Sequence, residues 1–138
     1  MQSHRWTNPS LPQTLQIAVF LLYFECGFGL LNLTGTSYGF VGGLPIIGPH
    51  LSATMVSLLV KLVFVGLGVA AFAIANEKKW GYIAAVALTA GELALLIWGY
   101  GGPLQVLKAV PINAMFSVAR VALLLHPMSR SHQRIWFK

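Results

Sequence analysis

Apolar residues dominate four long runs along the chain, at residues 13–33, 51–75, 80–98 and 104–126. A helix that crosses the hydrocarbon core of a bilayer needs about 20 predominantly apolar residues, so each run is long enough to cross it once. The pattern therefore predicts an all-α integral membrane protein built as a four-helix bundle. We expect residues 1–138 to form a single membrane domain.

Pro111 interrupts the fourth apolar run, residues 104–126. Proline lacks the backbone N–H and removes one helical hydrogen bond. Membrane helices tolerate proline where neighbouring groups satisfy the freed carbonyl. We therefore predict that the fourth helix continues through this position with a kink at Pro111.

The composition supports lipid as the surroundings of this chain. Hydrophobic residues make up 57% of the 138 residues and charged residues only 9%, against about 25% charged in a typical soluble domain. A soluble core of this size could not hide so much apolar surface. The net charge of +6 is not arranged as a soluble basic face, so nucleic acid is not a predicted partner. The single cysteine, Cys26, excludes an intramolecular disulfide and a thiolate-rich zinc site.

Basic residues that flank the four runs all fall on one side of the predicted membrane. They are Arg5, Lys78, Lys79, Arg130, Arg134 and Lys138. The connections at 34–50 and 99–103 contain no Lys or Arg. Because cytoplasmic loops carry an excess of Lys and Arg, we predict that both termini are cytoplasmic and that the host is the plasma (inner) membrane.

Glu25, Lys61, Glu92 and Arg120 are ionisable residues that lie well inside the runs, away from their ends. At 1.5 Å of rise per residue, the first three fall roughly 15–18 Å deep, near the middle of a core about 30 Å thick. Arg120 lies nearer the cytoplasmic side. A charge at the centre of a membrane helix costs about 2.5–3.5 kcal/mol on insertion scales. We therefore predict that these residues form one intramembrane charge cluster, because buried charges must be paired.

Each of these charges shares a helix face with small or polar residues, since positions three, four and seven apart lie on one side of a helix. Lipid offers polar groups no partner, so these faces are expected to meet inside the bundle. The predicted polar lining consists of Asn32, Thr54, Ser57, Thr89, Asn113 and Ser117.

Three functions are compatible with the charge cluster. The first is proton- or ion-coupled transport or relay, because two carboxylates near one ammonium cannot all be charged at low cost. In that case we expect Arg120 to turn away towards the cytoplasm and to leave one glutamate protonated, whereas an Arg120 that completes a fixed set of four ion-paired groups would make the cluster a structural brace. The second is a non-enzymatic accessory subunit of a larger membrane complex, with the charges as structural salt bridges. The third is an enzyme acting on a lipid or a quinone, although no HExxH, GxSxG or phosphate-loop motif occurs and no catalytic residue is predicted.

No metal and no cofactor are predicted. His50 and His126 fall at opposite faces of the predicted membrane, so they cannot hold one haem iron between them. Arg130, Arg134 and Lys138 are expected to contact anionic lipid headgroups at the cytoplasmic face, at about 1 kcal/mol per basic residue. The small-residue faces suit packing of helices, so we expect a homo-oligomer or a larger membrane complex.

Overall fold

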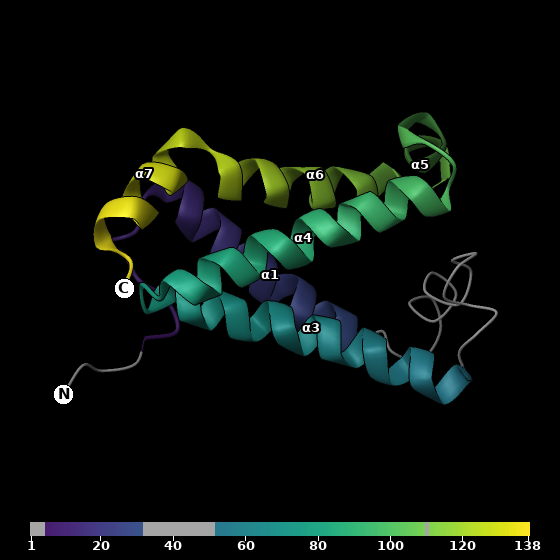
Figure 1. Ribbon diagram of the computed structural model, residues 1–138, viewed down its shortest axis with the longest axis horizontal. Coiled ribbons are helices and arrows are strands. Elements are labelled where there is room, and N and C mark those ends of the chain that lie inside the picture. The colour runs from purple at the N-terminus through teal and green to yellow at the C-terminus, as the bar shows by residue number, and fades with distance from the viewer. Residues whose placement is uncertain (1–4, 32–51, 110) are drawn as a thin grey trace.

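The computed structural model describes residues 5–31, 52–109 and 111–138. Within these ranges the chain forms six α-helices and no strand, which confirms the predicted all-α class (Figure 1). The helices are α1 (Gln13–Leu31), α3 (Ala53–Ala75), α4 (Lys79–Gly99), α5 (Pro103–Ala109), α6 (Pro111–Leu125) and α7 (Pro127–Trp136).

Four of the helices, α1, α3, α4 and α6, pack side by side. Helix α1 contacts α3 and α6, and α4 contacts the same two helices from the other side. The short helix α5 lies at one end of this arrangement, whereas α7, the C-terminus and the start of α1 lie at the other end (Figure 1). Because α6 contacts both α1 and α4, a side chain on its inner face can reach the other two helices.

Small and aliphatic side chains make the contact between α1, α3 and α4. The buried set includes Ala18 and Leu22 on α1, Leu67 and Ala71 on α3, and Ala85 on α4. Small residues let helix backbones approach closely, which increases the van der Waals contact between them. The contact between these three helices is therefore mainly apolar, so a charged group buried beside it needs a partner.

Both termini are joined to the turn between α3 and α4. The backbone N–H of Arg5 donates to Oδ1 of Asn76 at 2.9 Å, and Nδ2 of Asn76 donates to the Arg5 carbonyl at 2.8 Å. At the other terminus, the N–H of Lys138 donates to the carbonyl of Glu77 at 2.9 Å, and Lys79 N–H donates to the carbonyl of Lys138 at 2.8 Å. The chain thus begins and ends at the same end of the helix packing.

The predicted helix over residues 104–126 is divided into two helices in the structure. Helix α5 ends at Ala109 and α6 begins at Pro111. Figure 1 shows α5 turned away from the axis of α6. The ring of proline removes a helical hydrogen bond and disfavours helical geometry in the preceding residue, which agrees with a change of direction between the two helices. Residue 110 itself lies outside the described residues, so the predicted kink at this position stays a prediction. With 15 residues, α6 is about 22 Å long, shorter than the core of a bilayer.

Two helices in the described part of the chain are long and apolar enough to cross a membrane. They are α1 with 19 residues and α4 with 21 residues. Two further apolar segments, Lys61–Ala75 within α3 and Ala114–Leu125 within α6, are shorter. Length and composition therefore support two of the predicted crossings, at α1 and α4.

Candidate functional site

Arg120 of α6 is buried between three helices, with only 2% of its surface exposed. Its Nη1 atom forms ion pairs with the carboxylates of Glu25 on α1 and Glu92 on α4. The distance from Nη1 to Oε2 of Glu92 is 3.3 Å. Charged residues are almost never fully buried unless they are paired, and here one guanidinium serves two carboxylates. We call Glu25, Glu92 and Arg120 the carboxylate–guanidinium triad.

Helix α6 itself fixes the orientation of the guanidinium. Nη2 of Arg120 donates to the hydroxyl of Ser117 at 3.0 Å, and Nε donates to the carbonyl of Phe116 at 3.3 Å. Ser117 is buried and lies one turn before Arg120, on the same face of α6. Because all three guanidinium nitrogens have a partner, the planar group is held in one position between the two carboxylates.

The two carboxylates reach Arg120 because their helices start at the same end of the molecule. Glu25 lies about 18 Å along α1 from Gln13, and Glu92 lies about 20 Å along α4 from Lys79, at 1.5 Å per residue. Both helices contact α6. The equal depth of the two glutamates therefore follows from their spacing in the sequence, and the third helix supplies the cation between them.

The triad contains one more acidic group than basic groups. With both carboxylates ionised it would carry a charge of −1, and in the described part of the chain no second cation pairs with either glutamate. An uncompensated charge in apolar surroundings is costly. One proton shared by the two carboxylates would neutralise the group. The glutamate side chains are 23% and 24% exposed, whereas Arg120 is enclosed.

Lys61 does not join the other three charged residues in the structure. It lies exposed on α3 and forms no ion pair with any described residue. The reason is the orientation of α3, which turns the face that carries Lys61 away from the other helices. Leu67, Ala70 and Ile74 face the core, and Lys61 is two and a half helical turns before Ala70, on the opposite side of the helix. The expected proximity of Lys61 to Glu25 is therefore not found.

The predicted polar lining is divided between different surroundings. Ser117 is buried and contacts Arg120, as described above. Thr89 is also buried, but its hydroxyl donates to the carbonyl of Ala85 in its own helix at 2.7 Å. Thr54 is exposed. The predictions for Asn32 and for the side chains of Ser57 and Asn113 lie outside the described residues.

The third carboxylate, Glu77, has a structural role that the sequence did not reveal. Its Oε1 accepts from Nδ2 of Asn8 at 3.1 Å and from the hydroxyl of Ser10 at 3.3 Å. Its backbone is left-handed, with a φ of 56°, in the turn between α3 and α4. Glu77 thus helps to attach residues 8–10 to this turn. In the sequence, its position between two apolar runs indicated a connection between helices but not this contact.

No group of three or more His, Cys, Asp or Glu side chains that could hold a metal ion occurs among the described residues. Comparisons with known protein families, curated proteins and solved structures find no match. A function for this chain has to be inferred from its own residues and their arrangement.

Proposed function

We propose that this chain is an integral membrane protein of the plasma (inner) membrane and that its triad relays protons in proton- or ion-coupled transport. In this proposal α1, α3, α4 and α6 form a four-helix bundle within the bilayer, and both termini are cytoplasmic. The observation that carries the function is the surplus carboxylate: Glu25 and Glu92 share the single guanidinium of Arg120.

The outer surface of the helices supports insertion in a membrane. Large apolar side chains on several helices are more than half exposed, among them Phe20, Phe24 and Phe28 on α1, Leu62 on α3 and Met115 on α6. Soluble monomers rarely expose extended apolar patches, because water then orders around them at a cost. Lipid would cover these side chains, and so would the packing of further copies or subunits.

The distribution of basic residues supports the proposed orientation. The ends of the chain and the α3–α4 turn lie together (Figure 1), and this end carries Arg5, Lys78, Lys79, Arg130, Arg134 and Lys138. At the opposite end the described residues include one basic residue, Lys108 of α5. The positive-inside rule then favours the end with the termini as the cytoplasmic one.

A relay needs a group that can hold a proton and release it. The triad has such a group, because one carboxylate can be ionised against Arg120 while the other keeps a proton. Exchange of roles between Glu25 and Glu92 would move the proton from α1 to α4 without moving the guanidinium. Because Glu25 and Glu92 lie at nearly the same depth, this exchange moves the proton between helices, and its passage to either side of the membrane needs further proton carriers such as water.

A second candidate function is that of a structural subunit in a larger membrane complex. Its support is the fixed position of Arg120, which is enclosed and bonded through all three nitrogens. Breaking a buried ion pair is strongly destabilising, so such a group also serves as a brace between helices.

Reconstitution in liposomes distinguishes the two candidates. We expect the purified chain to dissipate an imposed pH gradient, measured with a trapped pH-sensitive dye. We expect Glu25→Gln to lower this flux at least tenfold, because the variant leaves a neutral Glu92–Arg120 pair with no surplus proton. Glu77→Gln is the matched control and should conduct normally. A chain that conducts no protons and always purifies in fixed stoichiometry with larger subunits would contradict the relay and favour the structural role.

A further inference from the structure

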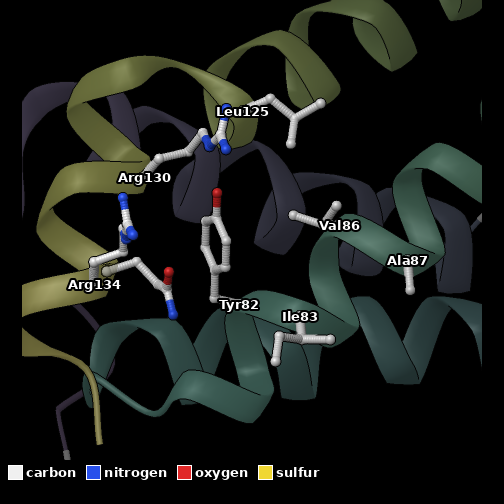
Figure 2. A pocket seen from close by; sticks show the side chains of 8 residues that line it. Tyr82, Ile83, Val86, Ala87, Leu125, Arg130 and Arg134 are labelled. Atoms are coloured by element: carbon white, nitrogen blue, oxygen red, sulfur yellow. The ribbon is translucent and has the colours of Figure 1, made fainter.

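A groove of about 750 Å³ lies between the first turns of α4, the end of α6 and helix α7 (Figure 2). The groove is open along one side. The Tyr82 hydroxyl at one side donates to the carbonyl of Leu124 at 2.5 Å. This bond joins α4 to the end of α6 and holds together two of the helices that border the groove. It lies apart from the carboxylate–guanidinium triad, and none of its lining residues belongs to that triad.

One end of the groove is basic. Arg130 and Arg134 line it from α7, four residues apart and therefore on the same face of that helix. Both are exposed, and within the described ranges neither forms an ion pair. In Figure 2 the side chain of Arg130 extends from α7 towards the Tyr82 hydroxyl, whereas the guanidinium of Arg134 stays beside α7. A guanidinium donates two parallel hydrogen bonds to phosphate oxygens, so this pair suits a phosphate group.

The rest of the groove is apolar. Ile83, Val86 and Ala87 line it along α4, and Leu125 lines it from the end of α6. The three residues of α4 share one face at helical spacing. They form a strip that leads away from the two arginines along α4, one of the helices long enough to cross a membrane. The groove therefore combines an end that suits a phosphate group with an apolar strip along α4. An amphiphile would match both parts, with its headgroup at the arginines and its apolar tail along the strip.

Two exposed tryptophans lie near the arginine end of the groove and indicate its depth in the proposed membrane. Trp80 lies in the first turn of α4 and Trp136 at the end of α7, and both are more than half exposed. Tryptophan is enriched at the headgroup level of membranes, where its ring is partly in apolar and partly in polar surroundings. The arginines between these two residues are thus expected at the depth of lipid phosphates.

We propose that this groove binds one anionic glycerophospholipid of the cytoplasmic leaflet. Its phosphate accepts hydrogen bonds from Arg130 and Arg134, and the first part of an acyl chain lies along Ile83, Val86 and Ala87. This inference rests on the proposed membrane placement of the chain and is independent of the proton relay.

Native mass spectrometry of the protein in detergent tests the site. The protein is mixed with equal amounts of dioleoyl phosphatidylglycerol and dioleoyl phosphatidylcholine, and the ratio of one-lipid adducts is measured. We expect phosphatidylglycerol to be favoured at least fivefold, and R130Q/R134Q to lower the ratio to about one. K78Q/K79Q removes the same charge from the same end and should keep the preference. Equal loss in both double variants would overturn the site and indicate a general surface attraction.

The apolar strip is tested separately with Ala87→Trp, which fills the groove without changing its charge. We expect this variant to lose the phosphatidylglycerol adduct, whereas Ala122→Trp, at an exposed position of α6, keeps it. An unchanged adduct in Ala87→Trp, or displacement of the lipid by millimolar inorganic phosphate, would overturn a lipid site in favour of a simple anion site. Release of the chain from membranes by an alkaline carbonate wash would instead contradict the membrane placement itself.

Discussion

At the scale of single residues, Arg120 is the side chain that links Glu25 to Glu92. The sequence spacing placed Glu25 and Glu92 at one depth, and the structure brings both to the guanidinium of Arg120. Spacing alone could not show that Lys61 lies on the outer face of α3. Periodicity tells which residues share a face of a helix, but not which face turns towards its neighbours when both faces are apolar or small.

Removal of the shared cation is expected to be costly. The variant Arg120→Gln would leave two carboxylates without a partner inside the helix packing. We expect it to lower the free energy of unfolding by about 3–5 kcal/mol, the usual cost of breaking a buried ion pair by removing one partner. Thermal unfolding in detergent, followed by circular dichroism, measures this effect.

Lys61→Gln is the matched control for this loss of one positive charge. Because Lys61 is exposed and has no ion-pair partner among the described residues, we expect a change within about 0.5 kcal/mol. Equal destabilisation by both variants would contradict the special position of Arg120.

At the scale of helices, apolar runs predicted three elements well. Helix α1 begins at the predicted Gln13, α3 ends at the predicted Ala75, and α4 covers Lys79–Gly99 against the predicted 80–98. The fourth run, residues 104–126, corresponds to two described helices, α5 and α6, on either side of residue 110. Hydropathy continues across Pro111, although proline cannot donate a backbone hydrogen bond. Hydropathy measures affinity for lipid, and the end of a helix depends on local backbone geometry.

Two glycines of α4 allow the effect of close helix packing to be measured apart from the effect of helix propensity. A Cβ atom at Gly81 would collide with Ala73 of α3, whereas a Cβ at Gly91 would meet no atom within 4 Å. We expect Gly81→Ala to destabilise the fold by about 1–3 kcal/mol, as overpacking does. Gly91→Ala should instead stabilise it by roughly 0.5–1 kcal/mol, because alanine loses less backbone entropy in a helix. The two melting temperatures should shift in opposite directions, and parallel shifts would contradict the α3–α4 contact.

At the scale of the whole molecule, the placement of the termini is the main topological observation. Both are hydrogen-bonded to the α3–α4 turn, while α5 lies at the opposite end (Figure 1). The charge pattern of the sequence predicted one basic side. It could not predict the hydrogen bonds that join the two ends to residues 76–79. At Lys138 these bonds use backbone groups that every residue carries, and at Arg5 they use the side-chain amide of Asn76, whose partner the charge pattern does not show.

Accessibility of single cysteines tests the proposed orientation. In a background in which Cys26 is replaced by alanine, Lys108→Cys should react with a membrane-impermeant thiol reagent added to intact cells. Lys79→Cys should react only after the cells are opened. Both sites are exposed in the structure, so burial does not affect the comparison. Reaction of Lys79→Cys in intact cells would show that the termini face outwards.

The central claim is that the triad holds one exchangeable proton, and infrared spectroscopy of the carboxyl C=O stretch tests it most directly. The chain has only three Asp and Glu residues, so the signal of a protonated carboxylic acid can be assigned by substitution. At neutral pH we predict a band from one protonated carboxyl that shifts in D₂O, persists in Glu77→Gln and disappears in both Glu25→Gln and Glu92→Gln. Absence of this band in the unaltered protein, or its persistence in Glu25→Gln and Glu92→Gln, would contradict the account.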